Sequence, residues 1–326
     1  MVESSLIPGL VDNVAELCLS RVPRSSFQII SQVCWRWRRF LRSEHYAAVR
    51  KLTGSVEELM CVLVSFESWE VYDGSGNKLG CIPPVPGPLK VRSGLVVSDG
   101  GKIVFIGGRY NKTASADVYE FNPATNRWRK LADMNLPRYN FAYAEVEGLL
   151  YVIRGYSTDD VSILNAEVYN PKTNQWSLMD CPQRPNFSPA FAFSFNSKLF
   201  IVGNRSRFID IYDPRKKTWE ELDSGQTLDV YSYTVVRNKV YFFDHNKPGL
   251  GVFDPEKNSW SSVLDVPSRN EHGLRFCLGQ WNNKVTLFPM GSEALSGDLV
   301  EEDASRWRAT PIILSGYHAT SVLINF

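Results

Sequence analysis

The sequence lacks the features that mark several common classes of protein. Its 326 residues carry 36 basic and 35 acidic side chains, so no overall charge favours nucleic acid or an anionic membrane as a partner. The longest apolar runs, such as residues 59–64, are far too short to span a bilayer. The first twenty residues also lack the basic and then apolar order of a secretory signal. We therefore expect a soluble protein of the cytoplasm, the nucleus or both, with no nucleic-acid or membrane partner.

Cysteine and histidine are sparse, and neither belongs to a recognisable catalytic pattern. The six cysteines include no CxxC pair, which in a chain of this size favours reduced thiols over a disulfide framework. The sequence has no Ser-His-Asp order, Walker loop or HExxH motif. We therefore expect no catalytic residues, no bound metal and no cofactor.

Aromatic residues are plentiful, and many of them belong to an internal repeat. The repeat reads aromatic residue, Asn or Asp, Pro, four further residues and Trp. Its clear copies are FNPATNRW (121–128), YNPKTNQW (169–176), YDPRKKTW (212–219) and FDPEKNSW (253–260), and weaker copies occupy 72–79 and 300–307.

Turn chemistry explains this pattern. An Asn or Asp side chain before Pro bonds nearby backbone and starts a turn. Asn also recurs two residues before the Trp position, where a tight hairpin often needs a positive φ; these residues are Asn77, Asn126, Asn174 and Asn258. We predict a hairpin at each copy, in which the aromatic residue and the Trp pack on two antiparallel strands.

The spacing of the repeat predicts a β-propeller. Two strand-like segments precede each hairpin, so each unit holds four strands, and successive Trp positions are 41 to 49 residues apart. This period is typical of propeller blades, and its longer steps favour kelch repeats over WD40 repeats. Trp128, Trp176, Trp219, Trp260 and Trp307 are predicted to be structural residues of the blades, and the first four are predicted to be largely buried packing groups.

The two ends of the repeat region complement each other. Residues 57–79 supply three strands with no first strand, and residues 317–326 supply a first strand with nothing after it. We therefore predict six blades, closed when the C-terminal strand completes the N-terminal blade, because closure removes sheet edges.

Residues 1–54 carry no such repeat and are predicted to be helical. Asn13 and Glu16 match a capping box before one helix. Phe27, Ile30, Cys34, Trp37 and Leu41 follow steps of three and four, which predicts one apolar helical face. The expected fold is thus a multidomain α+β chain, with a small all-α domain over 1–54 and an all-β propeller over 55–326.

The order of residues at the N-terminus resembles an F-box. Residues 6–41 contain a Leu-x-Pro start, a Leu-rich helix that ends in Val-Pro, and then Val-Cys-x-x-Trp-Arg. Together with the repeats, the whole chain resembles the plant F-box/kelch-repeat proteins. The resemblance implies a non-catalytic substrate receptor of an SCF-type ubiquitin ligase. Its F-box would bind a Skp-family adaptor, and through it cullin and RING subunits, while the propeller would recruit a target protein for ubiquitination and proteasomal degradation.

The resemblance also implies which residues face the adaptor. They are Leu6, Pro8, Leu10, Leu17, Val22, Pro23, Val33, Cys34 and Trp37. For the target, the loops of the propeller bring arginines to similar places in successive repeats. These are Arg92, Arg138, Arg184 and Arg269 before first strands, and Arg109, Arg154 and Arg205 near the ends of second strands. We predict that they surround the mouth of the central channel, against the alternative that they are ordinary solvated loop residues.

The sequence leaves two other functions open. The first is a kelch scaffold that binds partners without degradation. The second is a propeller enzyme of the copper-radical type, which would need His and Tyr ligands around one metal. Apart from His45, the histidines are His245, His272 and His318, near strand ends in three successive repeats. We expect them to be exposed loop residues rather than metal ligands.

Overall fold

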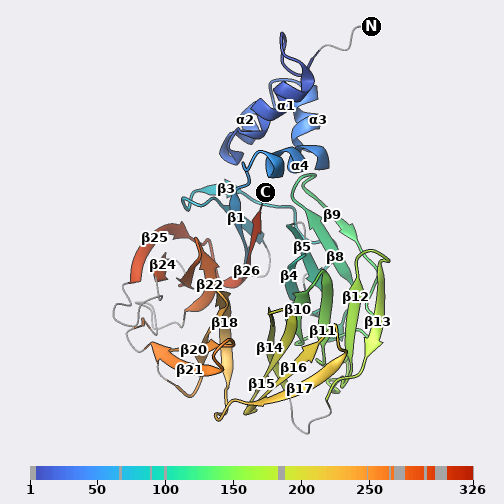
Figure 1. Cartoon of the computed structure of the whole chain (residues 1–326), viewed down its shortest axis with the longest axis vertical. Coiled ribbons are helices and arrows are strands. Elements are labelled where there is room, and N and C mark those ends of the chain that lie inside the picture. Colours follow the sequence, from blue (N-terminus) through green and yellow to red (C-terminus); the bar gives the residue numbers. More distant parts are fainter. Residues whose placement is uncertain are drawn as a thin grey trace.

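Five short helical segments form the N-terminal part of the chain, as the sequence predicts. The structure is a computed structural model that describes residues 5–65, 68–88, 90–98, 101–182, 188–247, 249–263, 266–267, 276–289, 292–297 and 307–325. The segments are α1 (Asp12–Ser20), the 3₁₀ helix η1 (Arg24–Ser26), α2 (Phe27–Ile30), α3 (Trp35–Leu41) and α4 (Glu44–Leu52). They lie at one end of the molecule, above the β-sheets in Figure 1. In the described ranges no helix is long and apolar enough to cross a membrane.

Two local predictions for these helices are wrong. Helix α1 begins after Val11 with no side-chain cap, and Asp12, not Asn13, ties its start by accepting a hydrogen bond from the Leu6 amide at 2.7 Å. The apolar spacing over 27–41 does not form one helix either. Cys34 is extended, and its Sγ caps α3 by accepting from the Trp37 amide at 3.4 Å. The chain therefore turns between α2 and α3.

Six four-stranded antiparallel sheets form the rest of the chain and confirm the six-bladed propeller (Figure 1). The strands of each blade are named from the innermost to the outermost. Blade 1 holds β26 (His318–Asn325), β1 (Glu58–Val64), β2 (Ser68–Tyr72) and β3 (Lys78–Gly80), and blade 2 holds β4 (Gly94–Ser98), β5 (Lys102–Ile106), β8 (Val118–Asn122) and β9 (Arg127–Lys130). Blade 3 holds β10 (Ala142–Val146), β11 (Leu149–Ile153), β12 (Ala166–Asn170) and β13 (Gln175–Met179), and blade 4 holds β14 (Ser188–Phe195), β15 (Lys198–Asn204), β16 (Phe208–Asp213) and β17 (Thr218–Asp223). Blade 5 holds β18 (Val230–Val236), β19 (Lys239–Asp244), β20 (Leu250–Asp254) and β21 (Ser259–Val263), and blade 6 holds β22 (Cys277–Trp281), β23 (Lys284–Phe288), β24 (Glu293–Gly297) and β25 (Trp307–Ile313). A short ribbon of β6 (Arg109–Tyr110) and β7 (Thr113–Ala114) extends a loop of blade 2.

The C-terminal strand closes the ring as predicted. Strand β26 pairs antiparallel with β1, and the register runs from Glu58 opposite Asn325 to Leu63 opposite Thr320. The first and last parts of the propeller are thereby joined by backbone hydrogen bonds, which removes two exposed sheet edges.

The repeated hairpins have the predicted turn chemistry. The Asn before the Trp position has a positive φ in three copies, at Asn126, Asn174 and Asn258, and Lys217 takes the same conformation in a fourth. In the weak copy the positive φ falls on Gly76 rather than on Asn77, which corrects that prediction. The residue before Pro accepts from backbone amides two or three positions later at Asn122, Asn170, Asp213 and Asp254.

The repeated Trp residues also join neighbouring blades. Each Trp pairs across the hairpin with its aromatic partner, as Tyr169 does with Trp176 at a ring separation of 5.2 Å. The indole N–H then donates to a carbonyl that follows the outer strand of the preceding blade: Trp128 to Pro83, Trp176 to Ala132 and Trp219 to Asp180. Trp176 is buried, but Trp128, Trp219, Trp260 and Trp307 are half-buried. The rings of these four lie on outer strands, so part of each remains accessible.

The helices and the propeller share one apolar core. Leu19, Phe40 and Tyr46 of the helices belong to the same buried cluster as Leu59 and Trp69 of blade 1. The division into domains at residues 54 and 55 stays a prediction, and α4 ends at Leu52 before β1 begins at Glu58. All six cysteines are free.

Candidate functional site

Helix α1 has apolar side chains on two opposite faces. Ala15 and Leu19 point inward and are buried. On the other side Val14 and Leu17 are exposed by 39% and 40%, and Leu10, just before the helix, is exposed by 37%. A helix that only covered the propeller would need one apolar face, so the outward face of α1 indicates a binding surface.

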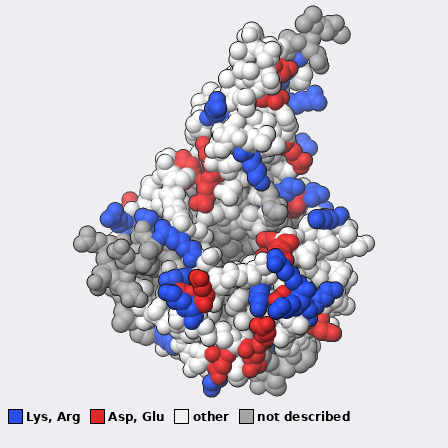
Figure 2. Space-filling view, in the orientation of Figure 1, with Lys and Arg blue, Asp and Glu red and all other residues white. Residues whose placement is uncertain are grey.

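A second exposed apolar group lies between α2 and α3. Val33 and Trp35 are exposed by 60% and 66%. We call Leu10, Val14, Leu17, Val33 and Trp35 the apolar helical surface. Most of the helical part is white in Figure 2, that is, uncharged on the face drawn.

The other residues expected to face an adaptor have different environments. Trp37 is half-buried, packs against the core shared with the propeller, and donates its indole N–H to the Leu6 carbonyl at 2.7 Å. Leu6 packs against the same core. Trp37 therefore holds the N-terminal segment in place, and the exposed tryptophan is Trp35, which lies outside the predicted set. Pro8 and Pro23 are exposed, whereas Val22 and Cys34 are half-buried.

The helices contact the propeller at one end of its strands. The end of β26 lies beside the start of β1, where the chain arrives from α4. The turn after β4 is close to the same place: a Cβ atom added to Gly101 in that turn would lie 2.9 Å from the Asn325 carbonyl oxygen. A groove of about 820 Å³ separates α4 from these turns. The loops that lead into the first strands lie at the opposite end, and so do the loops between second and third strands. The helices therefore leave this opposite end of the propeller uncovered, and we call it the free end.

Two of the arginines expected in these loops are buried, which corrects that prediction. Arg138 is fully buried and forms an ion pair with Glu167 at 2.5 Å, while its Nη1 donates to the carbonyls of Arg154 and Asn165. Burial lowers the pKa of Arg138, and the neighbouring Glu167 opposes this. The side chain of Arg154 is also buried and donates to the Pro182 carbonyl. Both side chains therefore tie together loops of blade 3 and belong to the structure of the propeller.

Three other arginines lie at the free end and are accessible. Arg109 donates to Asp160 and to the Tyr139 hydroxyl, both at 2.9 Å, and its guanidinium lies 4.5 Å from the centre of the Tyr139 ring. Arg92 approaches the same ring at 6.0 Å, and the side chain of Arg205 is 82% exposed. Hydrogen bonds from Tyr139 and Arg109 lower the pKa of Asp160. Arg184 and Arg269 lie outside the described residues.

Carboxylates lie beside two of these arginines, Asp160 beside Arg109 and Asp229 beside Arg205. On the face drawn in Figure 2, basic and acidic side chains are interspersed over the propeller. Arg92, Asp160 and Arg205 all have a positive φ, as the buried Arg154 also does. Arg92 also lines the mouth of the central channel.

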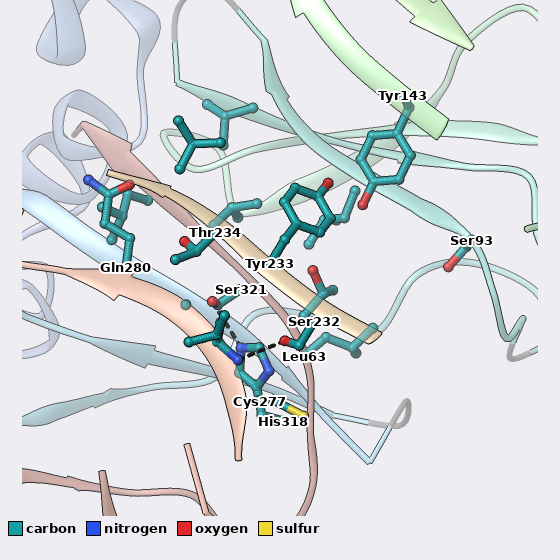
Figure 3. Close-up of a pocket in the computed structure, with 18 of the residues that line it drawn as sticks. Leu63, Ser93, Tyr143, Ser232, Tyr233, Thr234, Cys277, Gln280, His318 and Ser321 are labelled. Atoms are coloured by element: carbon teal, nitrogen blue, oxygen red, sulfur yellow. Dashed lines mark hydrogen bonds between the residues drawn. The ribbon is translucent and has the colours of Figure 1, made fainter. Parts of the chain in front are cut away.

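A cavity of about 520 Å³ occupies the central channel. Its lining comes from the innermost strands of several blades and includes Tyr143, Tyr233, Thr234, Gln280, His318 and Ser321 (Figure 3). The His318 ring is stacked on Phe288 with its Nε2 3.0 Å from the Ser321 hydroxyl. Burial lowers the pKa of His318 to about 4, so its imidazole is neutral near pH 7.

The histidines do not come together as metal ligands in the described residues. His318 lines the channel, His245 lies on a loop with its ring 4.7 Å from that of Tyr231, and His272 lies outside the described residues. Within the described ranges no group of three or more His, Cys, Asp or Glu residues could hold a metal ion.

Comparison with known proteins identifies an F-box and kelch repeats in the chain. A family model of the F-box domain matches residues 7–46, and one of the FKB95 kelch-repeats domain matches residues 67–290. An F-box/kelch-repeat protein of Arabidopsis thaliana is 65% identical over the full length of both chains. Another from the same plant is 36% identical over 99% of this chain and 90% of its own. The solved structure of YjhT has a TM-score of 0.56 at 14% identity over 74% of this chain and 91% of its own, and shows the likeness of fold.

Proposed function

Because the chain belongs to the family of F-box/kelch-repeat proteins, we propose that it is the substrate receptor of an SCF-type ubiquitin ligase. Its F-box binds a Skp-family adaptor and, through it, the cullin and RING subunits. Its propeller holds a target protein for ubiquitination and proteasomal degradation. The chain itself contributes binding and no catalytic group, and the transfer of ubiquitin is carried out by its partners.

The observation that carries this proposal is the outward apolar face of α1. Val14 and Leu17 are exposed on a helix whose opposite face is already buried by Ala15 and Leu19. Exposed large apolar side chains cost free energy in water, and they become favourable when a partner covers them. The apolar helical surface lies within the F-box match, so the adaptor is the partner that we assign to it.

The target, in this proposal, binds at the end of the propeller opposite the F-box. Arg92, Arg109 and Arg205 are accessible there, and a guanidinium binds a carboxylate with two parallel hydrogen bonds. Arg109 and Arg205 each pair with a carboxylate, Asp160 at 2.9 Å and Asp229 at 3.5 Å, but the side chain of Arg205 is 82% exposed and that of Arg109 only 20%, so Arg92 and Arg205 are the stronger candidates. We propose that they bind a target segment that carries carboxylates.

Affinity capture from cells treated with proteasome and cullin-activation inhibitors tests the proposal. The Leu10→Glu/Leu17→Glu variant places two charges on the apolar helical surface and should lose the adaptor and cullin while it keeps the target. Gln28→Glu/Gln32→Glu adds the same charge to exposed polar positions of the F-box and is the matched control. Arg92→Glu/Arg205→Glu should do the reverse, and keep the adaptor while it loses the target.

Equal capture of adaptor and cullin by the parent chain and by Leu10→Glu/Leu17→Glu would contradict the ligase function. A folded Arg92→Glu/Arg205→Glu variant that retains every captured target would contradict the target surface alone. Far-ultraviolet circular dichroism of each purified variant separates a lost contact from a lost fold.

A further inference from the structure

The central channel holds a cavity that the proposed ligase function does not use. Its volume of about 520 Å³ lies within the range of roughly 300–1,000 Å³ that small-molecule sites occupy. Its walls come from β4, β10, β18, β22 and β26, so five of the six blades contribute to it. Strands paired in a closed ring hold their side chains in fixed positions, and the cavity is therefore preformed.

The interior of this cavity is electrically neutral at pH 7. Among the described residues that line it, Arg92 is the only one with a permanent charge, and it is exposed at the mouth. Burial keeps the His318 imidazole neutral, and burial raises the pKa of both Tyr143 and Tyr233, so these two hydroxyls stay protonated. A charged ligand would lose its hydration here without gaining a counter-charge.

Several polar groups in the cavity have no partner within the described part of the chain. The Tyr233 hydroxyl, the Thr234 hydroxyl and the Gln280 amide take part in no hydrogen bond there. The Nδ1 atom of His318 is buried in the wall and is also unpartnered among the described residues. These groups include both donors and acceptors, and a ligand hydroxyl can serve either kind.

The remaining surface of the cavity is apolar and aromatic. Leu63, Leu95 and Leu278 line it together with the rings of Tyr143 and Tyr233, whose hydroxyls point toward the same part of the cavity in Figure 3. The Tyr233 ring is held in place by stacking on Phe191, with ring centres 4.1 Å apart. Aromatic rings fixed in this way prefer an aromatic partner to an aliphatic one of equal area.

We propose that the central channel is a binding site for a small uncharged phenol, whose ring packs among the leucine and tyrosine side chains and whose hydroxyl bonds the Tyr233 hydroxyl. The site needs no partner protein, because the full chain contains every group that it uses.

Isothermal titration of the full chain with 4-hydroxybenzyl alcohol tests the site. We expect one site per chain with a dissociation constant of roughly 0.1–1 mM for a ligand of this size. Toluene, which lacks both hydroxyls, and 4-(hydroxymethyl)cyclohexanol, which lacks the aromatic ring, should each bind at least about 10-fold more weakly. The anion 4-hydroxybenzoate should also bind more weakly, because its carboxylate must be desolvated.

Two isosteric channel variants report on the site. Tyr233→Phe and Thr234→Val each remove one hydroxyl that has no partner among the described residues, so neither should impair folding. Tyr233→Phe should weaken binding about 5-fold, whereas Thr234→Val alters the opposite side of the strand and should bind like the parent chain. Tyr110→Phe, which removes an exposed tyrosine hydroxyl outside the channel, is the matched control and should also bind like the parent chain. No heat of binding at about 5 mM 4-hydroxybenzyl alcohol, an affinity of Tyr233→Phe equal to that of the parent chain, or tighter binding of 4-hydroxybenzoate than of 4-hydroxybenzyl alcohol would overturn the proposal.

Discussion

The two repeat tryptophans Trp176 and Trp260 should respond differently to the same substitution. Trp176 packs at a tilt on the aromatic partner of its hairpin, with ring centres 5.2 Å apart, and Trp260 stacks on its own partner with ring centres 4.4 Å apart. The indole N–H of Trp176 donates to the Ala132 carbonyl at 2.9 Å. The indole N–H of Trp260 is buried and has no partner within the described residues. Trp→Phe therefore removes a hydrogen-bonded N–H at position 176 and an N–H without a hydrogen bond at position 260.

The size of the difference follows from these environments. Each substitution loses the outer part of the indole ring, which costs about 1 kcal/mol of apolar burial at both sites. At Trp176 the lost hydrogen bond adds about 1 kcal/mol, and the Ala132 carbonyl is left without its donor, which adds about 1 kcal/mol more. At Trp260 the substitution removes an unsatisfied buried donor, and this offsets the lost burial by about 1 kcal/mol or more. We therefore expect Trp176→Phe to destabilise the propeller by about 3 kcal/mol and Trp260→Phe to be close to neutral.

Urea unfolding followed by far-ultraviolet circular dichroism measures both changes without relying on tryptophan fluorescence. Trp219, whose indole N–H donates to the Asp180 carbonyl at 3.2 Å, is a second hydrogen-bonded case, and Trp219→Phe should also destabilise the propeller. Equal losses of stability at positions 176 and 260 would refute the reasoning, because they would show that ring burial alone accounts for the repeated tryptophan.

Three further predictions concern closure, charge and burial. Deletion of residues 317–326 should abolish the cooperative unfolding of the propeller, because blade 1 loses the strand that joins it to the end of the ring; a melting curve like that of the full chain would contradict this. Burial alone would raise the pKa of Asp117, but hydrogen bonds from Lys90, Lys130 and Ser115 outweigh burial and lower the pKa to about 2. The Asp117 carboxylate therefore stabilises the fold above pH 4, and this stabilisation is lost as the pH falls toward 2. Asp117→Asn should therefore reduce the difference in urea midpoint between pH 7 and pH 3, and an unchanged difference would count against the ion cluster. Arg138→Met should cost about 3–5 kcal/mol by leaving the buried Glu167 carboxylate without its counter-charge, whereas the exposed Arg205→Met should change the urea midpoint very little.

The parts of the fold that could be predicted from the sequence are those set by local chemistry repeated many times. Asn174 shows why. Its left-handed φ closes the hairpin, and its Oδ1 accepts from both the Tyr169 hydroxyl and the Ala132 amide. Each copy of the motif therefore carries its own turn, and the spacing of the copies gives the blades. Closure could be predicted as well, because each end of the propeller lacks what the other supplies.

The parts that could not be predicted depend on contacts between distant residues. Arg138 looks like any loop arginine in the sequence, and only the position of Glu167 in the folded propeller makes it a buried ion pair. The steps of three and four over residues 27–41 suit a continuous helix, and the turn at Cys34 that exposes Trp35 and packs Trp37 against the core is set by tertiary contacts. The channel-lining residues Tyr143, Tyr233 and Ser321 come from separate blades and share no sequence pattern.

The junction between the F-box and the propeller fixes the geometry in which the proposed functions operate. Arg50 is buried and donates to the carbonyls of Ser20 and Val22, and it lies 3.5 Å from the carboxylate of Glu57. Glu57 also accepts from the Arg24 amide, and the Arg24 guanidinium bonds the Pro123 carbonyl on a blade 2 hairpin. These contacts, together with the shared apolar core, leave no free hinge between Leu52 and Glu58. A strand of seven residues such as β1 spans about 20 Å, so a target bound at the free end of the propeller would be held at a fixed distance and orientation from an adaptor bound to α1.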